Sequence, residues 1–110
     1  MRVLAVGAHP DDLEILCGGT IARYVRAGHE VVMCHATTGD MGSFVHSREE
    51  ISRLRLAEAR RAAEIAGAEH RCLGLSDGEV NAADPAQKRL VVDLVRDAGP
   101  DAIVTHAPND

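Results

Sequence analysis

Residues 3–12 of the chain are Val3-Leu4-Ala5-Val6-Gly7-Ala8-His9-Pro10-Asp11-Asp12. The four apolar residues that open this segment predict a fully buried strand, because short apolar runs are typical of parallel sheets covered on both faces. A histidine and two carboxylates then occupy the turn that follows, where an α/β fold usually places its ligand site. The segment therefore predicts the first strand of an α/β protein and also the place of its functional site.

Outward from this segment, apolar runs of strand length alternate with stretches of helical period. Strands are expected over residues 2–8, 30–36, 70–73 and 102–105, and helices over residues 13–27, over residues 48–66 and from Pro85 onward. The buried faces of the helices are expected to carry Leu13, Leu16, Cys17, Ile21 and Tyr24, then Ile51, Leu54, Ala62 and Ile65, then Leu90, Val91, Leu94 and Val95. The alternation predicts an α/β fold: a Rossmann-like, doubly wound three-layer sandwich with a mainly parallel sheet.

The composition limits the classes of function and partner. With 110 residues and 45% hydrophobic content, the chain suffices for one domain but not two. Because 17 acidic residues against 12 basic ones give a formal charge of −5 at pH 7, we expect a small polar ligand and no nucleic acid as partner. No apolar run approaches the roughly 18 residues of a membrane span and no leader is evident, so we expect a cytoplasmic protein without membrane insertion. The sequence leaves open whether the chain forms a homo-oligomer.

Three scattered cysteines argue against a disulfide framework and a thiolate zinc site.

Polar residues follow the carboxyl end of every expected strand. They are His9, Asp11 and Asp12, then Thr37, Thr38 and Asp40, then Asp77, then His106, Asn109 and Asp110. Since the carboxyl ends of parallel strands share one edge of the sheet, we expect these side chains to gather there. The first turn does not match G-x-G-x-x-G, and its carboxylates would repel a phosphate, whereas imidazole and carboxylate are both zinc ligands. The alternative is that Asp11 or Asp12 merely caps the helix while the other complements its dipole.

Six short segments of the chain together resemble one known family. They are Ala8-His9-Pro10-Asp11-Asp12 with Glu14, Gly18-Gly19-Thr20-Ile21-Ala22, Thr37-Thr38-Gly39-Asp40-Met41-Gly42, Arg55-Leu56-Ala57-Glu58-Ala59, Leu73-Gly74-Leu75-Ser76-Asp77-Gly78 and Thr105-His106-Ala107-Pro108-Asn109-Asp110. In this order, over essentially the whole chain, they resemble the LmbE-like or PIG-L family of zinc-dependent N-acetylglucosaminyl deacetylases. The resemblance implies a hydrolase that removes acetyl from a small-molecule acetylated amino sugar conjugate. The implied cofactor is Zn²⁺, with another divalent metal such as Fe²⁺ as an alternative.

The resemblance also implies a role for each residue of the first motif. His9 and Asp12 are the implied metal ligands, and Asp11 is the implied general base that accepts a proton from a zinc-activated water. The family's third ligand, a histidine, belongs to a His-x-x-His segment that would follow Asp110, and a catalytic zinc normally keeps three protein ligands. We therefore expect residues 1–110 to be the N-terminal portion of a single Rossmann-like deacetylase domain, truncated before the last metal ligand and inactive alone.

Further residues near the same edge are weaker candidates. Candidate substrate contacts are Asp40, Asp77, Arg48 and His106. Asp40 and Asp77 are equally compatible with turn-forming acids, and Arg48 with a solvated helix start. Arg55 and Glu58 lie three residues apart on a helix, which fits an intrahelical ion pair better than catalysis.

A receiver-like signalling domain is the alternative from another functional class. Such a domain also binds a divalent cation through acidic residues after its first strand. It needs a phosphoacceptor Asp at the end of the third strand, where this chain has Leu73-Gly74-Leu75, and it has no use for His9. The sequence therefore favours the hydrolase.

Overall fold

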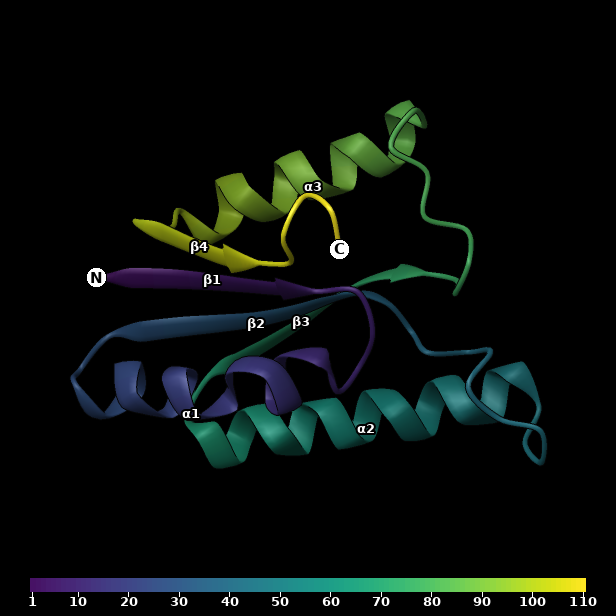
Figure 1. Cartoon of the computed structure of the whole chain (residues 1–110), viewed down its shortest axis with the longest axis horizontal. Coiled ribbons are helices and arrows are strands. Elements are labelled where there is room, and N and C mark those ends of the chain that lie inside the picture. Colours follow the sequence, from purple (N-terminus) through teal and green to yellow (C-terminus); the bar gives the residue numbers. More distant parts are fainter.

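All four expected strands are present and form one parallel sheet in the computed structural model, which describes residues 1–110 (Figure 1). In chain order the elements are β1 (Arg2–Gly7), α1 (Asp12–Arg26), β2 (Glu30–Thr37), α2 (Arg48–Ala66), β3 (Glu69–Leu75), α3 (Pro85–Ala98) and β4 (Ala102–Thr105). The predicted α/β class and parallel sheet are confirmed, with strand bounds that differ from the expected ones by at most two residues.

The strand order, β3-β2-β1-β4, explains why the helices lie on both faces of the sheet. The chain moves from β1 through β2 to β3 in one direction and then returns to place β4 on the other side of β1. Because crossovers between parallel strands are right-handed, this reversal puts α1 and α2 on one face and α3 on the other (Figure 1). The order reverses between β1 and β4, and ligands of such sheets bind beyond the carboxyl ends at this point.

Each face of the sheet carries its own apolar cluster, because successive strand residues point to opposite faces. The cluster under α1 and α2 contains Val3, Ala5, Leu13, Ile21, Val31, Met33 and Ala63. The cluster under α3 contains Leu4, Val32, Cys34, Leu94 and Ala98. None of the three helices has the length and apolarity that a membrane-spanning helix needs.

The expected buried face of α1 is wrong at Leu16. Leu13 and Ile21 are buried as expected, but the side chain of Leu16 is 70% exposed. The reason is a break in the helix: Cys17 has φ −142° and ψ 17°, so the residues before it do not continue the regular period of those after it.

The expected buried face of α2 is also partly wrong. Leu54 and Ile65 are exposed, whereas Ala59 and Ala63 are buried together with Ile51. The spacing of 51, 59 and 63 follows a row of residues four apart along the helix surface, and alanines on this row allow the helix to approach the sheet closely.

The amino-terminal half of α3 is less buried than its sequence suggests. Leu94 is buried, but Leu90 and Val91 are exposed. Figure 1 shows the cause, because the beginning of α3 diverges from the sheet and only its end lies close to β1 and β4.

The two leucines of the first turns of α1 provide a test of this packing. Leu13→Ala is expected to lower the free energy of unfolding by about 2 to 5 kcal/mol, because a buried leucine is lost. Leu16→Ala is expected to change it by less than about 0.5 kcal/mol, because an exposed side chain is removed. Urea unfolding of both variants measures the difference, and equal losses would contradict the helix break at Cys17.

Candidate active site

The turn after β1 is held closed by the carboxylate of Asp12. Its Oδ2 accepts hydrogen bonds from the backbone N–H groups of Ala8 at 3.1 Å and His9 at 2.8 Å. Gly7 permits the close return of the chain, since a Cβ on this residue would lie 3.1 Å from Asp12 Cβ. Burial opposes ionisation of Asp12, but these hydrogen bonds and the nearby His9 and His106 outweigh it and lower the pKa of the carboxyl. Asp12 is therefore an ionised side chain at the centre of the turn.

Asp11 adopts a conformation that is rare for a residue with a side chain. Its φ is 121°, and although it occupies the N-cap position of α1, its side chain makes no capping hydrogen bond. The capping alternative is therefore wrong for Asp11. Backbone strain of this kind is often found at functional sites, where the surrounding contacts hold it in place.

Arg55 of α2 is the contact that holds Asp11. Its guanidinium donates to Asp11 Oδ2 at 2.9 Å and to the carbonyl oxygen of Pro10. The predicted ion pair of Arg55 with Glu58 is present as well, at 3.4 Å. Sequence reasoning missed the contact with Asp11 because the two residues lie 44 positions apart. The one signal that could have pointed to a role for Arg55 at the site is its presence in one of the family-like segments.

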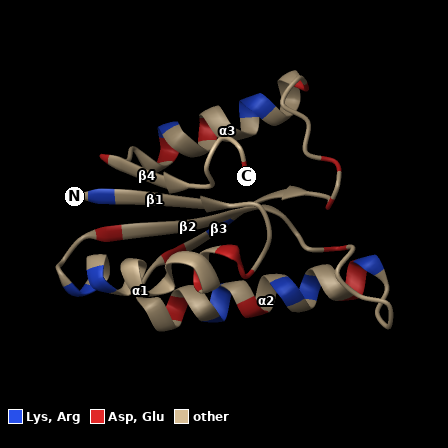
Figure 2. Cartoon of the chain, in the orientation of Figure 1, with Lys and Arg blue, Asp and Glu red and all other residues tan.

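His9 lies between two carboxylates. Its Nδ1 is 3.6 Å from Asp12 Oδ2, and its Nε2 is 3.6 Å from Asp77 Oδ1. Asp77 Oδ1 is buried and has no hydrogen-bond partner, whereas its Oδ2 accepts from the N–H of Met41 at 3.1 Å. The loop after β3 thus brings the Asp77 carboxylate next to the imidazole of His9, which follows β1. Figure 2 shows acidic residues on the turn after β1 and on the loop after β3.

An open cleft of about 480 Å³ lies over these residues. It is lined by His9, Asp11, Gly39, Met41, Gly42, Arg55 and Asp77. Clefts that bind small molecules fall in this range of volume. The structure therefore brings the candidate base, one candidate ligand and the candidate substrate contact Asp77 to a single cleft.

Asp40 and Arg48 lie outside this cleft and instead support it. Asp40 is buried; its Oδ1 accepts from the N–H of Asp77 at 2.8 Å, and its Oδ2 accepts from the guanidinium of Arg48 at 2.9 Å. The hydrogen bond from Asp77, despite the opposing effect of burial, and the contacts with Ser76 and Arg48 lower the pKa of Asp40. The pair links the loop after β2 to the loop after β3.

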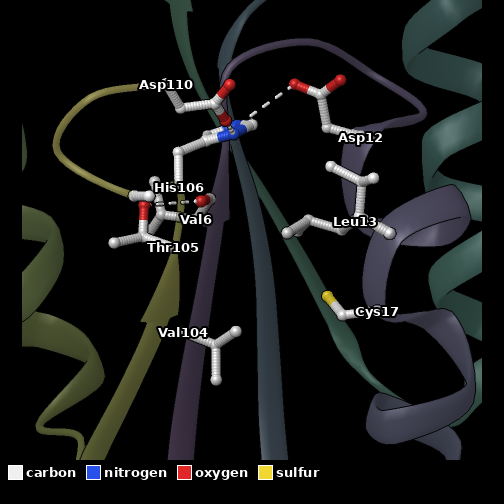
Figure 3. Close-up of a pocket in the computed structure, with 10 residues that line it drawn as sticks. Val6, Asp12, Leu13, Cys17, Val104, Thr105, His106 and Asp110 are labelled. Atoms are coloured by element: carbon white, nitrogen blue, oxygen red, sulfur yellow. Dashed lines mark hydrogen bonds and ion pairs between the residues drawn. The ribbon is translucent and has the colours of Figure 1, made fainter.

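His106 follows β4 and faces Asp12, as Figure 3 shows. Its Nε2 lies 3.3 Å from Asp12 Oδ2 and accepts from the N–H of Ala8 at 3.1 Å, while its Nδ1 lies 2.7 Å from Asp110 Oδ2. A second cavity of about 280 Å³ extends from this contact between α1 and β4. Asp12 thus stands between the cleft of His9 and the cavity of His106, at the point where the strand order reverses.

The donor chemistry of this edge suits a divalent metal, but the number of donors is incomplete. An imidazole and carboxylates are ligands of zinc, and the unpartnered oxygen of Asp77 shows that the polar groups here are not fully satisfied within the protein. No group of three or more His, Cys, Asp or Glu side chains is arranged to hold a metal ion. His9 and Asp12 are two of these donors, and His9 Nδ1 lies 3.6 Å from Asp12 Oδ2.

Fold and site together define an α/β protein whose polar side chains gather at the carboxyl edge of a parallel sheet, the arrangement of many α/β enzymes. Comparison with known proteins identifies the family. The sequence model of PIG-L, described as GlcNAc-PI de-N-acetylase, matches residues 4–110. The chain belongs to this deacetylase family, and a receiver-like domain is therefore the wrong alternative.

Two curated relatives illustrate the similarity in sequence. The chain is 33% identical over 110 residues to diacetylchitobiose deacetylase of Thermococcus kodakarensis, with 97% of this chain and 41% of the relative covered. It is 38% identical over 84 residues to 1D-myo-inositol 2-acetamido-2-deoxy-alpha-D-glucopyranoside deacetylase of Kineococcus radiotolerans, with 70% of this chain and 23% of the relative covered. The chain thus spans less than half the length of the relatives it matches.

Solved structures share the fold. N,N'-diacetylchitobiose deacetylase from Pyrococcus horikoshii aligns with a TM-score of 0.84 and 30% identity, over 92% of this chain and 39% of its own. The 4-carboxy-2-hydroxymuconate hydratase of Pseudomonas putida KT2440 aligns with a TM-score of 0.86 and 25% identity, over 100% of this chain and 50% of its own. The same fold therefore carries at least two reactions.

Asp40→Asn tests the support of the cleft. Since the pKa of Asp40 is lowered from 3.8, its ionised form stabilises the folded protein above about pH 3.8 and this contribution disappears as the pH falls through the folded-state pKa. The variant is expected to lower the free energy of unfolding by about 1 to 3 kcal/mol at pH 7 and by progressively less below pH 4. Urea unfolding at several pH values measures this.

The control for this experiment is Asp93→Asn, which removes an exposed carboxylate paired with Arg89 on α3. It is expected to change the stability by less than about 0.5 kcal/mol. A deficit of Asp40→Asn that stays constant down to pH 2 would show that the charge of Asp40 is not what holds the loops.

Proposed function

We propose that the protein removes the acetyl group from a small-molecule acetylated amino sugar conjugate by hydrolysis of the amide bond. The observation that carries the proposal is the turn after β1, which places His9, Asp11 and Asp12 together at the carboxyl edge in a chain of the PIG-L family. The names of its relatives, which are deacetylases of N-acetylated sugars, support the substrate class.

In this proposal His9 and Asp12 hold a divalent metal, Zn²⁺ or Fe²⁺. A bound metal of this kind polarises the amide carbonyl and makes a coordinated water more acidic. Because no third donor joins His9 and Asp12 within residues 1–110, a further ligand would come from a histidine outside them. The hydrogen bonds of Asp12 Oδ2 to Ala8 and His9 fix this ligand before any metal binds.

Asp11 is proposed as the general base. Arg55 engages its Oδ2, which orients the carboxylate over the cleft and leaves Oδ1 to accept the proton of the attacking water. The same proton then passes to the leaving nitrogen, so that acetate and a free amine are released. In its rare backbone conformation Asp11 lines the cleft and makes no capping hydrogen bond with the helix, which is compatible with this role.

Substrate recognition is proposed to involve Asp77 and His106 directly, with Asp40 and Arg48 acting through the loops they join. Asp77 lines the cleft, and a carboxylate there is suited to accept a hydrogen bond from a sugar hydroxyl. The loop over residues 40–46 carries exposed apolar side chains at Met41, which lines the cleft, and at Phe44, and this loop would distinguish one sugar conjugate from another.

A hydratase is the second candidate, because one close structural neighbour is named as a hydratase. Hydration adds water to a carbon–carbon double bond and releases no acetate. The deacetylase is favoured because the relatives with higher sequence identity carry that name.

The decisive experiment combines metal analysis with an assay of acetate release from N-acetylglucosamine-bearing substrates on the full-length gene product. Asp11→Asn is expected to keep the metal and to lose about 10²- to 10⁴-fold in kcat, because only the base is removed. His9→Ala is expected to lose the metal. Asp93→Asn, far from the site on α3, serves as the matched carboxylate control and should behave as wild type.

Two results would contradict the proposal. Equal loss of metal in Asp11→Asn and His9→Ala would remove the division of roles between base and ligand. Hydration of an unsaturated acid without any acetate release would favour the hydratase.

A further inference from the structure

The first turn of α1 is a separate unit from the rest of that helix. The backbone of Cys17 is not helical, and Gly18 and Gly19 follow it directly. Packing does not require glycine at these two positions, since a Cβ on Gly18 would meet only one atom at 3.9 Å and one on Gly19 would meet none within 4 Å. A break followed by two glycines weakens the mechanical connection between residues 12–16 and residues 18–26. Contacts outside the helix must therefore orient the first turn.

Beyond the two aspartates, two side chains of this turn reach into the protein. Leu13 is buried in the apolar cluster under α1 and α2, while Ile15 and Leu16 are exposed. Glu14 points towards β2, where its Oε2 lies 3.5 Å from Nε2 of His35. Leu13 provides apolar contact, which has no direction, so the polar contact of Glu14 is the one that can fix the orientation of the turn.

His35 is fully buried and its position is fixed by the sheet. It lies in β2 directly opposite Gly7 of β1, and its side chain is 0% exposed. Both ring nitrogens of His35 and both carboxylate oxygens of Glu14 are buried without a hydrogen-bond partner, and the 3.5 Å contact between Oε2 and Nε2 is the polar contact that joins the two side chains. Glu14 and His35 therefore depend on each other, and apolar residues of similar volume would fill this space at lower cost.

His70 completes a small, partly buried polar cluster and makes no hydrogen bond or ion pair with α1. Its ring stands 5.9 Å from that of His35 at an interplanar angle of 35°, and its Nε2 is also buried without a partner. A cavity of about 120 Å³ lies on the other side of Glu14, lined also by Asp11 and Arg55. Glu14 thus stands between a buried imidazole and the residues that hold the strained turn.

We propose that Glu14 and His35 form a positioning pair that fixes the first turn of α1, and with it Asp11 and Asp12, against the sheet. Neither residue touches the substrate in this role. The roles of Asp11 as a base and of Asp12 as a metal ligand rest on the proposed function. The mechanical role of Glu14 and His35 does not depend on it.

Amide hydrogen exchange, measured by NMR on the chain of residues 1–110, tests the mechanical role. The reporter is the N–H of Ile15, which donates to the Asp11 carbonyl at 3.0 Å, and the reference is the N–H of Ala27, which donates to the Arg23 carbonyl at 3.0 Å. In Glu14→Gln and in His35→Gln, exchange at Ile15 is expected to accelerate by about tenfold, while exchange at Ala27 changes by less than about twofold. His70→Gln is the matched control and should leave Ile15 as in wild type.

Three results would overturn the proposal: no acceleration at Ile15 in either variant, equal acceleration at Ile15 and Ala27, or the same effect from His70→Gln as from His35→Gln. Glu14→Gln keeps the shape of a partly exposed side chain, so it remains informative if His35→Gln unfolds the core. A zinc titration separates this proposal from the proposed function. If the wild-type full-length gene product binds no zinc but Ile15 responds as expected, the metal assignment fails and the positioning pair stands.

Discussion

The two hydrogen bonds that Asp12 Oδ2 accepts from the N–H groups of Ala8 and His9 are the interaction on which the rest of the site depends. They close the chain into a turn tight enough that Gly7 is needed beneath it. Within the closed turn His9 lies next to the same carboxylate, and Asp11 has its rare conformation and contacts Arg55. One ionised side chain thus closes the turn that carries the three polar residues of the motif.

The topology of the sheet decides which other segments can meet this turn. Since β1 lies between β2 and β4, the loops after both neighbours arrive beside it, and His106 reaches Asp12 from the β4 side. The loop after β3 lies one strand further away, and hydrogen bonds of Asp77 with Asp40 and with the N–H of Met41 hold it beside His9. On the β4 side, the site is therefore built by the loop of a strand directly next to β1. On the β3 side, it is built by polar contacts that pass from one loop to the next.

The parts of this structure that follow from local pattern could be predicted, and the parts that depend on distant partners could not. The bounds of α2 and β4 agree with those expected from apolar period, Pro and Gly signals. The break at Cys17 could not be predicted, because the apolar period of the sequence continues across it. The contact of Arg55 with Asp11 spans 44 residues. The spacing of residues along the helix could therefore indicate only Glu58 as a partner of Arg55.

Burial of apolar side chains holds the core, whereas contacts of ionised carboxylates hold the site, so the two respond differently to a fall in pH. The two apolar clusters contain no ionisable carboxylate, whereas the carboxyl edge is joined by ionised Asp12 and Asp40, both of whose pKa values are lowered. As the pH falls through these lowered values, the contacts of the edge are lost while burial of apolar surface is unaffected. The loops and the first turn of α1 should therefore loosen in acid before the sheet unfolds, which makes the geometry of the site less stable than the fold that carries it.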